Sequence, residues 1–156
     1  FLVLESAQAG LSWATILKKR EGYCQAFADF NVEVVAEYGQ GMVEDLLLDA
    51  SIIRNRAKIE AAINNARRFI EVQKEFGNFD AYIWQFVGGE PIINHWKSMS
   101  EVPVTTKESD ALSKDLKKRG MNFVGSTIIY AFMQSIGMVN DHEITCFRYK
   151  EHLKFK

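Results

Sequence analysis

A carboxylate and an indole flank a glycine near the start of the chain. Glu5 lies within an apolar helical run, and Trp13 follows Gly10, which interrupts that run. Burying a glutamate is costly unless it meets a partner, so this placement indicates a site for a polar or cationic ligand on whose ring the indole could stack. The alternative is a solvent-exposed glutamate at a helix end and a tryptophan in the core. On these residues alone, the alternative is the more common arrangement.

A tight helical hairpin in the last third of the chain is a second candidate site. Thr105–Glu108 offers a capping box at the start of its first helix, and glycines border its five-residue connection. The backbone N–H groups that open the second helix, together with neighbouring cations, could bind a phosphate of a DNA backbone. An ordinary corner between two helices stays open as the alternative. The residues that would form the clamp are Lys117, Lys118, Arg119, Gly120, Gly125, Ser126 and Thr127.

A metal pair is the third candidate. His142 and Cys146 are four residues apart, so on a helix they share a face at a spacing suited to two ligands of one zinc ion. Two ligands are half of a structural zinc site, and such a pair is often incidental. The other cysteine, Cys24, has no histidine base nearby in the sequence, and we expect it in the core.

The elements that position these residues are predicted to be helices throughout. Apolar residues recur at helical spacing almost everywhere, and no segment sustains the alternation typical of a half-buried strand. We therefore predict an all-α fold. The expected helices cover residues 1–8, 11–27, 32–38, 42–48, 54–76, 79–87, a helix that ends before Gly120, and 126–135. In the segment 11–27, the residues expected to face inward are Trp13, Ile16, Leu17, Tyr23 and Phe27. Residues 90–106 are expected to be irregular.

Length and composition exclude several protein classes. A chain of 156 residues with 47% apolar and 25% charged residues suits one domain with a real core, over residues 1–156, rather than a disordered segment or a disulfide scaffold. Its 19 basic and 20 acidic residues give a net charge of −1, so any site for a polyanion must be local. No apolar run is long enough to span a membrane, and two distant cysteines favour a reducing, cytoplasmic compartment. The basic cluster at residues 54–58 and 67–68 is expected to be a solvated helix face.

Taken together, the segments resemble the DNA-3-methyladenine glycosylase I family of bacterial alkylation-repair enzymes, within the helix-hairpin-helix superfamily. The resemblance covers roughly residues 1–147 and rests on the order and spacing of five blocks. These are Leu4–Glu21, Ile53–Ile59, Asp110–Gly120, Phe123–Thr127 and Val139–Cys146. The first contains the pattern Leu-Glu-x-x-Gln-Ala-Gly-Leu-Ser-Trp, and the last contains Val-Asn-Asp-His-x-x-x-Cys. The resemblance implies a two-lobed helical glycosylase fold with the helix-hairpin-helix motif at about residues 107–136.

The resemblance implies an activity and roles for single residues. Glu5 would recognise a flipped, cationic 3-methyladenine and act in catalysis, and Trp13 would stack on that base. The superfamily's Schiff-base lysine is replaced by Thr127, which implies a monofunctional hydrolase. Asn140 stands where the superfamily places its catalytic aspartate, so a role for Asp141 as general base is in doubt. Gln8 and Leu11, with Gly10 between them, are candidates for the wedge that fills the space left by the flipped nucleotide.

The resemblance also implies a structural zinc ion, with His142 and Cys146 as two of its four ligands. The chain begins without Met inside a helical pattern, and we expect a preceding segment with the other two ligands to be missing. The expected partner is double-stranded DNA that contains alkylated adenine, bound by a monomer in the cytoplasm. Two alternatives remain: a non-catalytic helix-hairpin-helix DNA-binding module, and an all-α interaction domain with incidental motifs.

Overall fold

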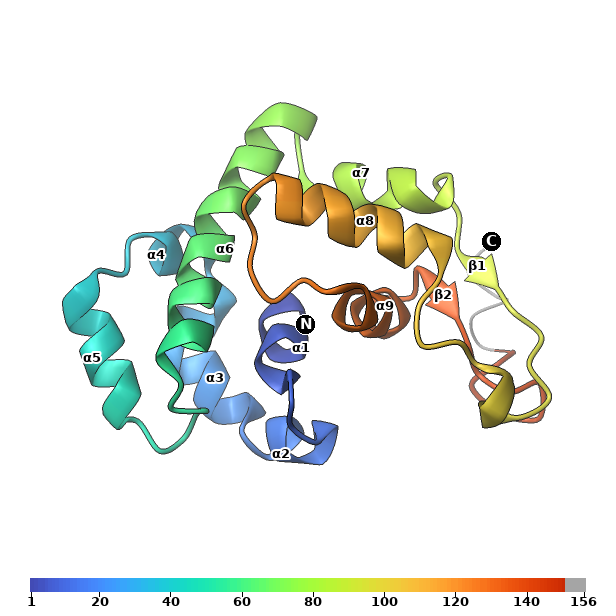
Figure 1. Cartoon of the computed structure of the whole chain (residues 1–156), viewed down its shortest axis with the longest axis horizontal. Coiled ribbons are helices and arrows are strands. Elements are labelled where there is room, and N and C mark those ends of the chain that lie inside the picture. Colours follow the sequence, from blue (N-terminus) through green and yellow to red (C-terminus); the bar gives the residue numbers. More distant parts are fainter. Residues whose placement is uncertain (151–156) are drawn as a thin grey trace.

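The computed structural model describes residues 1–150 and confirms an all-α fold (Figure 1). Its helices are α1 (Leu2–Gln8), α2 (Trp13–Lys18), α3 (Arg20–Ala26), α4 (Val32–Ala36), α5 (Gln40–Leu48), α6 (Arg56–Phe76), α7 (Phe79–Trp84), α8 (Lys107–Lys118) and α9 (Ser126–Ser135). Short 3₁₀ segments cover Ala28–Phe30, Gln85–Val87 and Met99–Glu101. Two short strands, β1 (Ile92–Ile93) and β2 (Val139–Asn140), pair in parallel with Ile92 opposite Val139.

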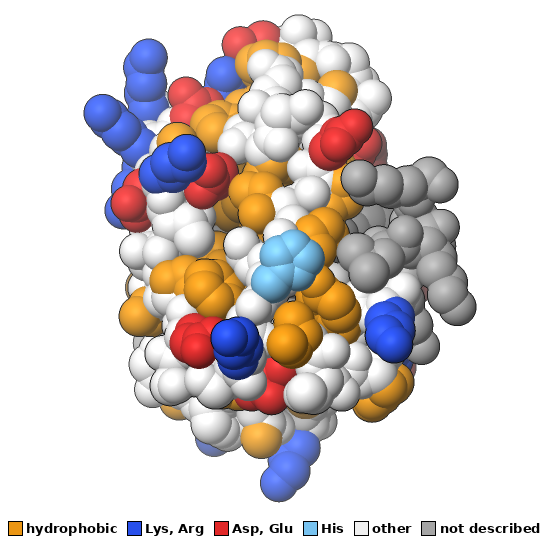
Figure 2. Space-filling view, turned by 90° about the vertical axis from the view of Figure 1, so that its right-hand side faces the viewer, with side chains coloured by type: hydrophobic (Ala, Val, Ile, Leu, Met, Phe, Trp, Pro, Cys, Tyr) orange, Lys and Arg blue, Asp and Glu red, His pale blue; other side chains and the backbone are white. Residues whose placement is uncertain are grey.

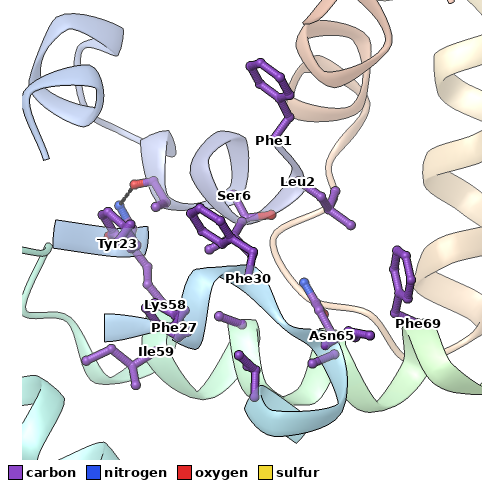
Figure 3. A pocket seen from close by; sticks show the side chains of 16 residues that line it. Phe1, Leu2, Ser6, Tyr23, Phe27, Phe30, Lys58, Ile59, Asn65 and Phe69 are labelled. Atoms are coloured by element: carbon purple, nitrogen blue, oxygen red, sulfur yellow. Dashed lines mark hydrogen bonds between the residues drawn. The ribbon is translucent and has the colours of Figure 1, made fainter. Parts of the chain in front are cut away.

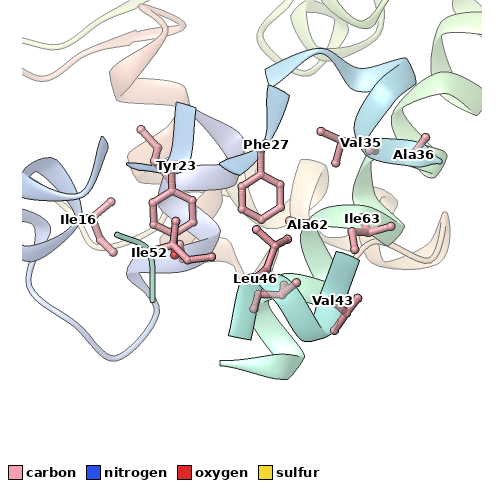
Figure 4. Packing of buried hydrophobic residues seen from close by; sticks show 14 residues of the cluster. Ile16, Tyr23, Phe27, Val35, Ala36, Val43, Leu46, Ile52, Ala62 and Ile63 are labelled. Carbon is pink, nitrogen blue, oxygen red and sulfur yellow. The ribbon is translucent and has the colours of Figure 1, made fainter. Parts of the chain in front are cut away.

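The long helix α6 joins two hydrophobic clusters and so defines two lobes. Its first half packs with α1 to α5 around Ile16, Tyr23 and Phe27, which are at most 3% exposed (Figure 4). Its second half contributes Val72 to a cluster formed with α7, α8 and α9. Because one helix belongs to both clusters, burial of its apolar face fixes the two lobes relative to each other.

Three details of the predicted elements are wrong. The expected helix over residues 11–27 is divided at Lys19 into α2 and α3. α2 therefore buries one narrow face at Ile16, and Leu17, the next residue around that helix, is 49% exposed. The capping box at the start of α8 lies one residue later than expected, between Thr106 and Ser109. The irregular segment at residues 90–106 contains β1, which is too short to show an alternating pattern.

No helix within residues 1–150 combines the length and the apolar composition that crossing a bilayer requires.

Candidate functional site

The first helix carries the candidate carboxylate between two larger elements. α1 packs against α6 on one side and α9 on the other, near the centre of the molecule (Figure 1). Glu5 is only 4% exposed, so the alternative of a solvent-exposed glutamate is wrong. Burial raises the pKa of the Glu5 carboxyl above its ordinary value.

Glu5 and Trp13 line the same open cleft of about 430 Å³. The indole stands at the first residue of α2, which is capped by Ser12 through a hydrogen bond from the Thr15 N–H to Oγ (3.2 Å). The opposite wall is formed by Gln134 and Ser135 at the end of α9. The sequence analysis did not identify these two residues, because only the packing of α1 against α9 brings them to the cleft. The cleft thus offers one carboxylate, one indole and small polar groups to a planar ligand.

A tight turn connects α1 to α2 at the edge of this cleft. Gly10 has a φ of +74°, which favours glycine, and the Gln8 side-chain amide donates to the Leu11 carbonyl oxygen (3.1 Å). Gln8 lines the cleft, and Leu11 is 37% exposed. The Lys58 ammonium donates to the carbonyl oxygens of Ala7 (2.9 Å) and Ala9 (2.7 Å), so a cation caps the C-terminal end of α1.

The basic cluster of residues 54–68 is therefore only partly a solvated face. Besides Lys58, the Arg67 guanidinium donates to the carbonyl oxygens of Ala36 (2.8 Å) and Tyr38 (3.1 Å), and Arg56 pairs with Glu44 (2.8 Å). These contacts hold α4 and α5 against α6. The sequence did not indicate these hydrogen bonds, because each carbonyl acceptor comes from a distant part of the chain.

A second, mostly apolar cavity of about 180 Å³ lies on the other side of α1 (Figure 3). The Ser6 hydroxyl faces it and has no hydrogen-bond partner within residues 1–150. Lys58 also lines this cavity, and burial lowers the pKa of its ammonium. A cationic ring is therefore better matched by the cleft, where Glu5 supplies the opposite charge, than by this cavity, where the nearby charge is positive.

The predicted hairpin is present as α8 and α9, which pack against each other across a short loop. Gly120 has a φ of +85°, which explains its glycine, whereas Gly125 has an ordinary φ of −61° and open space where a Cβ would stand. Within the described residues no side chain caps α9, so the N–H groups of its first turn, beginning at Ser126 and Thr127, remain available. An anion can be bound there by the geometry typical of a helix N-terminus.

The three cations of the hairpin have different surroundings. Lys117 and Lys118 are exposed at the end of α8. Arg119 instead pairs with Asp115 (2.7 Å) and Glu75 (2.6 Å), and its guanidinium lies 5.0 Å from the ring centres of Phe76 and Tyr82. These contacts favour an intramolecular role for Arg119, which ties α8 to α6 and α7, over a phosphate contact.

Asp141, the doubtful general base, lies at the centre of a hydrogen-bond network. Its carboxylate accepts hydrogen bonds from Trp96 (2.6 Å), Asn94 (2.8 Å), Gln134 (2.7 Å) and the Tyr130 hydroxyl. Burial alone would raise the pKa of Asp141, but these donors together hold it below its ordinary value. A carboxylate with four donors has little capacity left to accept a proton from water, which argues against Asp141 as a general base. Its hydrogen bond to Gln134 holds that amide at the cleft.

The candidate metal pair lies on the face that carries β1 and β2. The His142 Nδ1 and Cys146 Sγ atoms are 3.8 Å apart, close to the separation of two ligands in a tetrahedral zinc site. Residues 1–150 bring no group of three or more His, Cys, Asp or Glu side chains together for a metal ion. On this face, hydrophobic side chains gather around a histidine (Figure 2).

Comparisons with known proteins agree with this geometry. The sequence pattern of a family described as methyladenine glycosylase matches residues 1–149. The chain is 48% identical over 145 residues to DNA-3-methyladenine glycosylase 1 of Escherichia coli (strain K12), which covers 93% of this chain and 78% of that protein. A crystal structure of 3-methyladenine DNA glycosylase I superimposes with a TM-score of 0.89 at 48% identity, over 94% of this chain and 80% of that one. A glycosylase I from Staphylococcus aureus, solved to explain 3-methyladenine recognition, has a TM-score of 0.91 at 35% identity, over 94% and 78% of the two chains.

Proposed function

The chain belongs to the methyladenine glycosylase family, and from this premise we propose how its own residues perform the reaction. The protein is a monofunctional DNA glycosylase that hydrolyses the N-glycosidic bond of 3-methyladenine in alkylated DNA. The assignment of residues rests on one observation: the buried Glu5 lines the same cleft as Trp13. Release of 3-methyladenine from alkylated duplex DNA by this chain, measured by chromatography of the freed base, tests the function directly.

Recognition depends on the charge of the damaged base. Methylation at N3 makes the adenine ring of the nucleotide cationic, so the Glu5 carboxylate both accepts its hydrogen bonds and offsets its charge. A cation in the cleft favours the ionised form of Glu5, which opposes the effect of burial on its pKa. Trp13 stacks on the flipped ring. Unmodified adenine is neutral and would leave this buried carboxylate without a charged partner.

The lesion itself supplies much of the driving force for bond cleavage. The bond between the sugar carbon and the base nitrogen breaks, and its electron pair passes to the cationic base, which leaves as neutral 3-methyladenine. Water then adds its hydroxyl to the sugar carbon and releases a proton. The positive charge that develops on the sugar would be stabilised by the carboxylate of Glu5, which is 4% exposed and therefore weakly hydrated. Position 127 is Thr, which cannot form a Schiff base with the sugar.

The hairpin holds the DNA backbone in this proposal. Phosphates would meet the N–H groups at the start of α9, at Gly125, Ser126 and Thr127, next to Gly120 and the exposed Lys117 and Lys118. Gln8 and Leu11, on the turn around Gly10, would fill the gap that base flipping leaves in the stack, and the lining of the cleft by Gln8 and the exposure of Leu11 support this role. The partner is double-stranded DNA and the working unit is a monomer. The protein acts where bacterial DNA is repaired, in the cytoplasm.

Replacing Lys117 and Lys118 with Ala is expected to weaken binding to every duplex, damaged or not, because phosphates carry no sequence information. The slope of log affinity against log salt should fall by about 0.9 unit per lost contact. Gly125→Val should weaken binding likewise without unfolding the protein, since a side chain there meets open space. Fluorescence anisotropy with a labelled duplex at several salt concentrations measures both effects.

Lys74, near the end of α6, provides the matched control. Its replacement with Ala removes a cation outside the hairpin and should leave affinity and salt slope nearly unchanged. A loss of binding confined to lesion-containing DNA would argue against a backbone clamp. An unchanged affinity of both hairpin variants for undamaged duplex would favour the ordinary helix corner instead.

We also propose that His142 and Cys146 contribute two ligands to a structural zinc ion. Their 3.8 Å separation suits one ion, and two further ligands are needed to close a tetrahedral site. Zinc there would supply no chemistry to bond cleavage, because neither residue lines the cleft that contains Glu5. The ion would join chain segments and so add to stability.

Cys146→Ser is expected to lower zinc content and thermal stability in the zinc-loaded protein, while activity per folded molecule stays the same. Elemental analysis and thermal denaturation of both proteins measure the two effects. Cys24→Ser is the control, because Cys24 lies in the other lobe and bonds to Asp29. A zinc-free protein with full stability would remove both residues from the metal site.

A further inference from the structure

The hairpin loop that precedes α9 has an unfavourable backbone shape. Phe123 has a φ of +53°, in the left-handed region that a bulky residue seldom adopts, and Gly120 has a φ of +85°. Such a conformation persists only when surrounding contacts determine it. The position of the N–H groups that open α9 therefore depends on whatever holds residues 120–124.

One side chain of α6 binds both backbone polar groups in the middle of this loop. The Asn65 side-chain amide donates to the Asn122 carbonyl oxygen (2.8 Å), and its Oδ1 accepts from the Asn122 N–H (2.8 Å). Asn65 is 6% exposed, whereas Asn122 lies on the surface, so these hydrogen bonds are partly buried. Its neighbour Asn64 donates to the Gly120 carbonyl oxygen (2.7 Å) and to Asn122 Oδ1 (3.0 Å). Ser113 Oγ donates to the carbonyl oxygen of Val124 (2.6 Å).

These contacts turn the loop carbonyls inward. The carbonyl oxygens at residues 120, 122 and 124 all accept hydrogen bonds from side chains of α6 or α8. Because alternate carbonyls are fixed against the protein, the chain enters α9 in a single orientation, and no side chain of the described residues caps the first N–H groups of that helix.

The same helix also fixes the base cleft. Lys58, seven residues before Asn65 and about 10 Å away along α6, caps the end of α1 that carries Glu5 and Gln8. The loop and the cleft are thus attached to one rigid element, at two points whose separation is set by helix geometry.

We propose that Asn65 is a positioning residue for DNA: by pairing with both backbone polar groups of Asn122, it holds the hairpin loop at a fixed distance from the base cleft. This inference rests on the proposed function, in which the hairpin binds phosphates and the cleft binds the base. Asn65 itself touches neither. Its amide acts through the loop.

Two substitutions test the proposal. Asn65→Leu keeps the size of the side chain and leaves both polar groups of Asn122 unpaired. Asn65→Asp keeps an acceptor for the Asn122 N–H and loses the donor to its carbonyl. The leucine variant should bind every duplex about tenfold more weakly, because the loop loses both hydrogen bonds that hold Asn122 against α6 and is released from its left-handed conformation. The aspartate variant should lie between the leucine variant and the parent protein.

The kinetic readout separates positioning from general damage to the fold. The KM for alkylated duplex should rise by the same factor as the dissociation constant, while kcat at saturating DNA and binding of free 3-methyladenine stay within about twofold of the parent values. Gln73, a half-buried amide further along α6, provides matched controls in Gln73→Leu and Gln73→Glu. Val72→Ala, which makes a cavity in the second cluster, reports the effect of lost stability alone.

Three results would overturn the inference. A folded Asn65→Leu protein with unchanged duplex affinity would show that the loop keeps its shape without Asn65. Equal losses of duplex and free-base binding would indicate a general structural role. If Asn65→Leu does not fold, an Asn65→Asp protein with unchanged KM would have the same meaning. Failure of the proposed function looks different, because the parent protein itself would then release no base from alkylated DNA.

Discussion

The variant Glu5→Gln is expected to bind 3-methyladenine about 100-fold more weakly than the parent protein, since a hydrogen bond to a charged group contributes about 1.5–3 kcal/mol. Glutamine keeps the size of the side chain but replaces a charged acceptor with a neutral amide, so the hydrogen bonds that the free, neutral base donates become weaker. Excision from alkylated DNA should fall at least as far, because in the proposed mechanism the same carboxylate also offsets the positive charge of the damaged nucleotide and of the reacting sugar. Affinity for undamaged duplex should change little. Titration with the free base and single-turnover excision measure these effects.

The free energy of unfolding is expected not to fall in Glu5→Gln, although base binding does. Burial raises the pKa of Glu5 in the folded protein, so the folded state holds that proton more tightly than the unfolded chain. The stability linked to this group is therefore greatest below the unfolded pKa and is lost as pH rises through the folded pKa. At neutral pH, Glu5→Gln should be at least as stable as the parent. Base binding by the parent should weaken as pH falls through the raised pKa.

Glu33→Gln, on the exposed side of α4, is the matched control and should change neither property. Equal binding of the free base by the parent and by Glu5→Gln would remove Glu5 from the recognition site. A strongly destabilised Glu5→Gln protein would indicate that the carboxylate has a structural partner instead.

The largest loss of stability is expected for Asp141→Asn. An asparagine at this position presents an NH₂ group to side chains that already donate, so at least one of Trp96, Asn94, Gln134 and Tyr130 loses its acceptor. Losing charged hydrogen bonds in this partly buried site should cost about 3 kcal/mol. For a domain of this size, Tm should fall by about 6–12 °C. Thermal denaturation followed by circular dichroism measures the change.

Asp110→Asn, an exposed acid in the first turn of α8, is the control for this experiment. The excision rate per folded molecule should change much less for Asp141→Asn than its stability does, since the carboxylate supports Gln134 from outside the cleft. A fully stable Asp141→Asn protein that no longer excises the base would instead assign Asp141 to the chemistry.

The local signals in the sequence were sufficient for most elements of the fold. Gly77 with a φ of +87° ends α6 and Gly120 ends α8, as their positions after apolar helical runs predicted. The hairpin helix Ser126–Ser135 was predicted at its observed bounds. The places of Glu5 and Trp13 on either side of Gly10 left an exposed glutamate and a core tryptophan open as the alternative, whereas the structure brings both residues to one cleft.

The residues that were missed act across long sequence distances. Gln134 reaches the cleft because α9 packs against α1, and Asn65 reaches Asn122 because the loop between α8 and α9 lies against α6. Neither amide has a spacing that distinguishes it from an ordinary helix residue. In the sequence, Arg119 has the same predicted role as Lys117 and Lys118. Its intramolecular role follows only from the positions of Glu75 and Phe76 in the folded protein. Local patterns predict helices and caps, whereas partners of polar side chains depend on the assembled fold.

The two attachments of α6 have a consequence for the order of folding. The hydrogen bonds from Lys58 to Ala7 and Ala9 join residues 51 and 49 positions apart, and the Asn65–Asn122 pair spans 57 positions. Contacts of such high contact order require closure of long chain loops, which local helix formation does not need. A chain emerging during synthesis can therefore form α1 and α6 as helices before it has either the cleft or the clamp. Both sets of hydrogen bonds can form only after residue 122 has been synthesised. The cleft and the phosphate-binding hairpin are therefore held together only from that point of synthesis onward.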